Sequence, residues 1–173
     1  MKVAPSTINF TANKMSKRQA NYFKEQLQNS KNVDIVCHES TDRDSLNSAI
    51  AMQRYMDTLG VNSKIIISQE LPKLGIMNPT FRYVQADEIN EQTETPETVL
   101  CVDFSAKERV AENILNHINK TKNVLCIDHH QGTNLFSKDC AIIRKSIPNA
   151  DKVIETSVPC YVDSSALSAT SII

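Results

Sequence analysis

The chain has 173 residues and a mass of 19.4 kDa, enough for one domain with a hydrophobic core and short for two. Its composition, 40% hydrophobic and 23% charged, is typical of a globular protein, and the net charge of −1 argues against a basic surface for duplex nucleic acid. No apolar run approaches the roughly 18 residues of a membrane span, and the first residues lack the apolar core of a signal peptide. We therefore expect a cytoplasmic protein that does not bind membranes.

Hydrophobic periodicity predicts alternating strands and amphipathic helices along the chain. The predicted helices are residues 15–30, 45–60 and 106–120, and Gly60 ends the second. The predicted strands are residues 34–38, 64–68, 81–86, 98–103, 123–128, 138–145 and 152–157. Residues 87–98 are expected to form a solvated surface loop or a turn of helix, and residues 161–173 a strand or turn followed by a helix. Continuous apolar strands between amphipathic helices predict an α/β fold, with a mainly parallel sheet and helices on both faces.

Three of the predicted strands end in side chains that can bind a ligand. The run DIVCH ends at His38, VLCVD ends at Asp103, and VLCID ends at Asp128, which His129 and His130 follow. In an open parallel sheet, ligands bind at the carboxyl ends of the strands. A single aspartate at a strand end is often only a helix cap. Three such ends together favour a shared site.

The stretch HESTDRD adds two carboxylates, Asp42 and Asp44, close to His38. Either aspartate could simply cap the following helix and complement its dipole. Capping does not account for His38, so a metal site remains the alternative reading.

Carboxylates and imidazoles without thiolates suit hard-to-borderline divalent ions, with Mn²⁺ or Mg²⁺ ahead of zinc. A bridging carboxylate would hold two such ions about 3.5–4 Å apart, the spacing used in phosphoryl hydrolysis. Cys37, Cys101 and Cys126 lie within apolar runs, and we expect buried structural thiols rather than zinc ligands. His117 is expected to be a surface or packing histidine.

Four stretches in this order, HESTDRDSLNSAIA, VLCVDFS, VLCIDHHQG and YVDSSALSAT, resemble the motifs of the DHH phosphoesterases. The resemblance runs from about Asp34 to Ile173 and implies a Rossmann-like DHH domain. The superfamily includes RecJ-like nucleases, oligoribonuclease/pAp phosphatases, cyclic dinucleotide phosphodiesterases and family II inorganic pyrophosphatases. The intact Asp-His-His looks most like the oligoribonuclease/pAp phosphatase group.

The resemblance implies two divalent metal ions with a shared ligand. One ion would be held by His38, Asp42 and Asp103, and the other by Asp44, Asp103, His129 and Asp163. His130 would face the substrate as a catalytic residue, and Asp128 would orient a neighbouring histidine.

The implied activity is hydrolysis of phosphoester bonds in short oligonucleotides or nucleoside bisphosphates by a two-metal-activated water. The expected partners are short single-stranded RNA or DNA, or a small nucleotide, and a second copy of the chain in a homodimer. Alternatives are a non-catalytic metal or nucleotide-binding module, a pyrophosphatase-like activity and a cyclic dinucleotide phosphodiesterase. We expect residues 1–33 to form an amino-terminal helical segment and residues 34–173 the DHH domain, with a second, substrate-binding domain absent from this chain.

Overall fold

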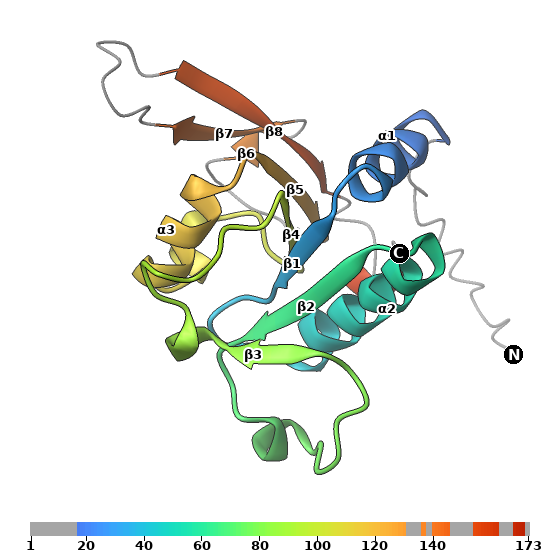
Figure 1. Cartoon of the computed structure of the whole chain (residues 1–173), viewed down its shortest axis with the longest axis vertical. Helices are drawn as coiled ribbons and strands as arrows, with labels where there is room; N and C mark the ends of the chain where they lie inside the picture. Colours follow the sequence, from blue (N-terminus) through green and yellow to red (C-terminus); the bar gives the residue numbers. More distant parts are fainter. Residues whose placement is uncertain (1–16, 131–135, 138–139, 146–153, 163–167, 172–173) are drawn as a thin grey trace, which may run out of the picture.

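The computed structural model describes residues 17–130, 136–137, 140–145, 154–162 and 168–171. Its strands form an eight-stranded sheet in the order β3-β2-β1-β4-β5-β8-β7-β6 (Figure 1). Neighbouring strands are parallel from β3 across to β8, and antiparallel in the pairs β8–β7 and β7–β6. The strands are β1 Asn32–Val36, β2 Asn62–Ile67, β3 Tyr83–Gln85, β4 Thr98–Val102, β5 Asn123–Asp128, β6 Phe136–Ser137, β7 Cys140–Lys145 and β8 Ile154–Val162.

Helices cover both faces of this sheet (Figure 1). The helices are α1 Lys17–Gln28, α2 Arg43–Leu59 and α3 Glu112–Lys120, with 3₁₀ turns η1 Leu71–Leu74, η2 Ala86–Glu88, η3 Lys107–Arg109 and η4 Ala169–Ser171. Alternate strand residues face opposite sides: Ile35 and Leu100 belong to the core with α1 and α2, whereas Val36 and Cys101 belong to the core with α3. Both sets of positions are buried, which explains the continuous apolar runs. The predicted α/β class, with a mainly parallel sheet covered on both faces, is confirmed.

The order of the strands reverses between β1 and β4. From β1 the chain builds outward through β2 to β3, and it then returns to the other side of β1 to form β4 and β5. The register pairs Val36 with Cys101, and Val102 with Ile127, so the carboxyl ends of β1, β4 and β5 lie side by side. An open α/β sheet has its ligand crevice at such a reversal.

Several boundaries differ from the sequence prediction. Helix α3 begins at Glu112, whereas the helical pattern predicted a start at residue 106. The reason is Val110, which has an extended backbone (φ −131°, ψ 150°) and places its side chain in the core with α3. Strand β8 runs to Val162 and is longer than the predicted strand 152–157.

The predicted terminal helix appears, in the described part of that stretch, as the single turn η4. None of the helices in the described ranges combines the length and the apolar character that a membrane crossing needs.

Candidate metal centre

The predicted site residues come together at the carboxyl edge of the sheet. His38 lies two residues beyond β1, Asp42 and Asp44 lie at the start of α2, and Asp103 directly follows β4. Asp128 is the last residue of β5, and His129 and His130 come next. Asp163, the predicted ligand that follows β8 in the sequence, lies outside the described residues.

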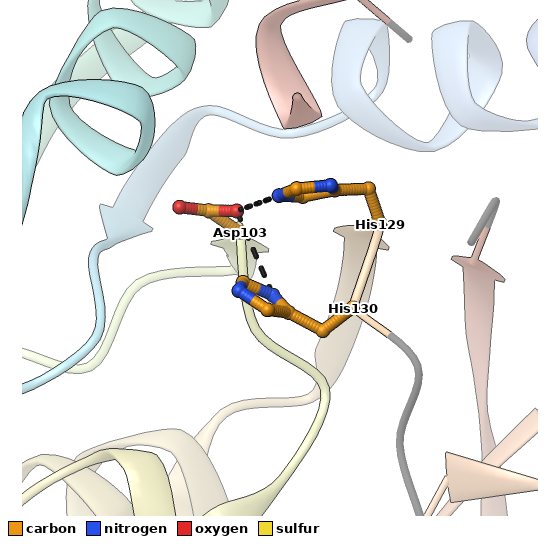
Figure 2. Close-up of side chains that lie close together, drawn as sticks. All are labelled: Asp103, His129 and His130. Carbon is orange, nitrogen blue, oxygen red and sulfur yellow. Dashed lines mark ion pairs between the residues drawn. The ribbon is translucent and has the colours of Figure 1, made fainter. Parts of the chain in front are cut away.

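Asp103 is at the centre of this arrangement. Its Oδ2 lies 3.6 Å from His38 Nε2, and its Oδ1 lies 3.2 Å from His129 Nε2 and 3.7 Å from His130 Nδ1. Figure 2 shows both histidine rings turned toward this carboxylate. Asp103 is the one non-glycine residue with positive φ (65°) in the described part of the chain, and its N–H donates to the Ile127 carbonyl at 2.9 Å. This turn at the end of β4 is a strained backbone conformation of the kind that is concentrated at functional sites.

Two sets of ligand atoms share Asp103. The first, which we call the His38 group, contains His38, Asp42 and Asp103, and the second, the His129 group, contains Asp103, His129 and His130. Within each group, one ligand atom from every residue lies within 4.8 Å of the others. The His38 group has the three residues predicted for the first ion.

The His38 group contains buried polar atoms that lack hydrogen bonds. The exposed fraction is 2% for His38 and 1% for Asp103. Within the described residues, neither ring nitrogen of His38, nor Asp103 Oδ1, has a hydrogen-bond partner. The neighbouring oxygens, 3.6 and 3.7 Å from His38 Nε2, are too distant to bond. Buried polar groups are normally satisfied, so these atoms indicate a missing partner such as a cation.

Asp42 has both of the roles that the sequence left open. Its Oδ1 accepts hydrogen bonds from the backbone N–H groups of Asp44 and Ser45, each at 3.0 Å, and so caps α2. Its Oδ2 faces His38 Nε2 at 3.7 Å. One oxygen therefore stabilises the helix, while the other is available to a cation.

The His129 group differs from the predicted second set of ligands. It includes His130, whereas Asp44 is outside the group although its Oδ2 lies 3.4 Å from His129 Nε2. His130 Nδ1 is 2.7 Å from Asp128 Oδ1. Because a carboxylate can only accept, this nitrogen carries a proton and cannot coordinate an ion at the same time. His129 and Asp44 are thus better placed as ligands than His130.

A family comparison decides what kind of domain this is. The model of the DHH family, N-terminal domain, matches residues 32–171. The chain belongs to the DHH family. An uncharacterized protein of Methanocaldococcus jannaschii is 27% identical to this DHH chain over 124 residues, which make up 70% of the chain and 37% of that protein.

A solved structure shares the fold. The crystal structure of an exopolyphosphatase-related protein from Bacteroides fragilis matches with a TM-score of 0.66 at 15% identity. The match covers 91% of this DHH chain and 42% of that chain. The chain therefore spans less than half the length of either relative. At this identity, the likeness shows the fold alone.

Asp128 organises the Asp-His-His stretch of the DHH domain. Its Oδ1 accepts hydrogen bonds from the backbone N–H of His129 at 2.8 Å, from that of His130 at 3.1 Å, and from His130 Nδ1. Its Oδ2 accepts the Ser105 hydroxyl at 2.6 Å. Sequence reasoning missed Ser105, which is close to Asp103 in the motif VLCVDFS but has no distinguishing spacing.

The buried thiols and His117 do not belong to the two groups of ligand atoms. Cys37, Cys101 and Cys126 are buried, as predicted. The Cys37 thiol donates to the Ser45 carbonyl, and that of Cys126 donates to the Phe104 carbonyl. Burial raises the pKa of the Cys37 thiol to about 12, which keeps it protonated near neutral pH. His117 is a buried packing histidine whose Nε2 lies 2.8 Å from Asp34 Oδ2.

The donor set fits a pair of divalent cations. The orphaned atoms of His38 and Asp103 are buried, the shared carboxylate has one oxygen toward each group, and the ligand atoms are imidazole nitrogens and carboxylate oxygens. Such ligands suit Mn²⁺ or Mg²⁺ better than a thiophilic ion.

Proposed function

We propose that this DHH domain is a metal-dependent phosphohydrolase that cleaves phosphoester bonds in short oligonucleotides or nucleoside bisphosphates. The observation that carries the proposal is the shared Asp103 carboxylate, with His38 and Asp42 on one side and His129 on the other. Membership of the DHH family supports the same reaction class.

The charge of the site supports a role for cations. Asp42, Asp44, Asp103 and Asp128 gather four carboxylates at one edge of the sheet, and this charge would repel a phosphate. When bound, two divalent ions would neutralise the carboxylates, stabilise charge on the phosphate oxygens and make water a better nucleophile. His38, Asp42 and Asp103 would hold one ion, and Asp44, Asp103, His129 and Asp163 the other. We expect Mn²⁺ to be preferred.

His130 is proposed to contact the substrate. Its side chain is 47% exposed, and the bond from Nδ1 to Asp128 fixes the ring. The opposite nitrogen, Nε2, is then the atom that could polarise a phosphate oxygen or donate a proton to the leaving group. Asp128 serves this role as an orienting partner.

Two features support the proposed substrate class, namely the net charge of the chain and the intact Asp128-His129-His130 sequence. A net charge of −1 gives no broad positive surface for a duplex, so a short single strand or a small nucleotide is the better match. We further propose that the protein is cytoplasmic and forms a homodimer.

The test supplies Mn²⁺ and measures mononucleotide released from a dinucleotide, and phosphate released from adenosine 3′,5′-bisphosphate. Inorganic pyrophosphate, polyphosphate and a cyclic dinucleotide complete the substrate panel. We expect turnover of the linear phosphoesters that a chelator abolishes. Turnover confined to pyrophosphate, polyphosphate or the cyclic dinucleotide would contradict the substrate class. Normal Mn²⁺ binding without turnover of any phosphate compound would instead indicate a binding module.

A further inference from the structure

The carboxylate of Asp44 is held by the last described turn of the chain. Its Oδ2 accepts a hydrogen bond from the Ala169 backbone N–H at 2.8 Å. Its Oδ1 accepts one from the Thr170 N–H at 3.2 Å and one from the Thr170 hydroxyl at 2.7 Å. These donors belong to η4, which lies more than 120 residues further along the chain.

The turn η4 is itself fixed against α2. Ala169 is fully buried, and the Thr170 hydroxyl lies 3.0 Å from the hydroxyl of Ser48, a buried residue one turn beyond Asp44. Thr170 therefore connects two positions on the same face of α2. Because its partners belong to a packed helix, the turn can impose a fixed orientation on the carboxylate.

Among the described residues, the hydrogen bonds to the Asp44 carboxylate leave one acceptor position on Oδ2 unused. A carboxylate offers about four lone-pair positions, two on each oxygen. Thr170 takes both positions on Oδ1, and Ala169 takes one on Oδ2. The remaining Oδ2 position belongs to the oxygen that lies 3.4 Å from His129 Nε2.

We propose that Thr170 is a positioning residue for the metal centre, acting through Asp44. Its hydroxyl and N–H fix the carboxylate of Asp44 so that Oδ2 faces His129 and can share a cation with His129 and Asp103. The inference rests on the proposed metal-dependent function, and it adds the η4 turn to the parts of the chain on which the site depends. Outer-shell partners of this kind affect metal affinity by roughly 10- to 100-fold when they are replaced.

Three threonine variants test the role of the hydroxyl. Thr170→Val removes it with little change of shape, Thr170→Ser keeps it, and Thr58→Val removes an exposed hydroxyl that bonds within α2 to the Tyr55 carbonyl. Calorimetric titration with Mn²⁺ measures the affinity of each ion. We expect Thr170→Val to weaken the binding of one of the two Mn²⁺ ions by about 10-fold or more. Thr170→Ser and Thr58→Val should retain the affinities of both ions.

A double-mutant cycle tests the contact separately from the ions. Thr170→Val and Asp44→Asn, alone and combined, are compared by the midpoint of urea unfolding without metal. We expect the two effects to be non-additive, because each substitution disrupts the same hydrogen bonds. Additive effects would overturn the proposal, as would wild-type Mn²⁺ affinities in Thr170→Val or an equal loss at both ions.

A different experimental result would refute the proposed function. Two Mn²⁺ ions in the wild type, one of them sensitive to Thr170→Val, together with no turnover of any phosphoester, would refute the activity and support the positioning role. Turnover of a phosphoester, together with Mn²⁺ affinities that are the same in the wild type and in Thr170→Val, would support the activity and refute the positioning role.

Discussion

Asp103 has a buried carboxylate, a positive φ and a position between two sets of ligand atoms. A left-handed conformation costs a residue with a side chain roughly 1–2 kcal/mol, although aspartate tolerates it better than most. The surrounding sheet maintains it, because the Asp103 N–H continues the hydrogen bonding between β4 and β5 by one residue. The carboxylate is thereby directed between His38 and His129.

We expect Asp103→Asn to abolish binding of both Mn²⁺ ions together. The amide keeps the shape of the side chain but loses the negative charge and one acceptor oxygen, and both ligand groups depend on those oxygens. Calorimetric titration of the variant measures the number of ions bound. One ion bound with its normal affinity would show that Asp103 does not bridge.

We expect Asp128→Asn to lower kcat by about 10- to 100-fold and to affect Mn²⁺ affinity much less. The reason is that the charged acceptor for His130 Nδ1 is lost, whereas His38, Asp42 and Asp103 keep their positions. Steady-state kinetics and Mn²⁺ titration measure the two effects. The control is Ser105→Ala, which removes only the bond to Asp128 Oδ2 and should have a smaller effect on kcat. Equal losses in the two variants would contradict an orienting role centred on His130.

At the scale of elements, the start of α2 combines a helix cap with a ligand site. Asp42 caps the helix through one oxygen, and Gly60 ends it in a left-handed conformation (φ 72°) with its N–H bonded to the carbonyls of Met56 and Asp57. The same helix presents Asp42 and Asp44 to opposite sides of the centre, toward His38 and His129 respectively. The stability of α2 and the geometry of the site are therefore coupled at Asp42.

Substitutions at Asp42 should separate these two roles. Asp42→Ser keeps an oxygen for the cap but removes the second oxygen that faces His38, so we expect nearly normal stability with weaker Mn²⁺ binding. Asp42→Ala should weaken Mn²⁺ binding similarly and also lower the free energy of unfolding by about 1 kcal/mol. Urea unfolding without metal and Mn²⁺ titration measure the two effects. Identical stabilities for the serine and alanine variants would refute the capping role.

Helix α3 is anchored to β1 by a buried polar pair, His117 and Asp34. We expect His117→Leu to destabilise the fold by about 3–5 kcal/mol, because Asp34 would stay buried and, among the described residues, would keep Lys64 Nζ at 3.6 Å as its remaining charged partner. Urea unfolding measures the loss. Asn116→Leu, at an exposed position of the same helix, is the control and should change stability little. Destabilisation of equal size in both variants would contradict this account.

For the whole molecule, the reversal of strand order between β1 and β4 creates the site. Within the described residues, three separate segments, at the ends of β1, β4 and β5, contribute its side chains, and η4 supports Asp44 from a distant part of the chain. In the unfolded chain these groups are far apart. Cations held by the centre should therefore bind the native state much better than the unfolded state.

We expect Mn²⁺ to raise the melting temperature of the protein by roughly 5–10 °C per ion at about 100 times its Kd. The physical reason is that each ion satisfies buried atoms, such as those of His38 and Asp103, that otherwise lack partners within the described residues. Thermal unfolding followed by circular dichroism measures the shift, and Asp103→Asn should eliminate it. A melting temperature that is indifferent to Mn²⁺ would contradict the metal centre.

The sequence alone determined the class of fold and the residue types at the strand ends. Strands buried on both faces must be apolar along their whole length, so β1, β4 and β5 were visible as runs ending near His38, Asp103 and Asp128. The parallel arrangement then placed these ends at one edge. The ligand roles of these residues remain predictions.

Only the tertiary structure decided which groups meet. Strand order made Asp103 the neighbour of both His38 and His129, and hydrogen bonds across the sheet placed its backbone at positive φ. Packing between segments distant in sequence brings the Ser105 hydroxyl to Asp128 and the Thr170 hydroxyl to Asp44. Val110 packs into the core, and α3 therefore begins later than the sequence predicted. Local sequence patterns report the burial and capping preferences of a segment. They carry no information on its distant partners, which are selected by the packing of the whole sheet and its helices.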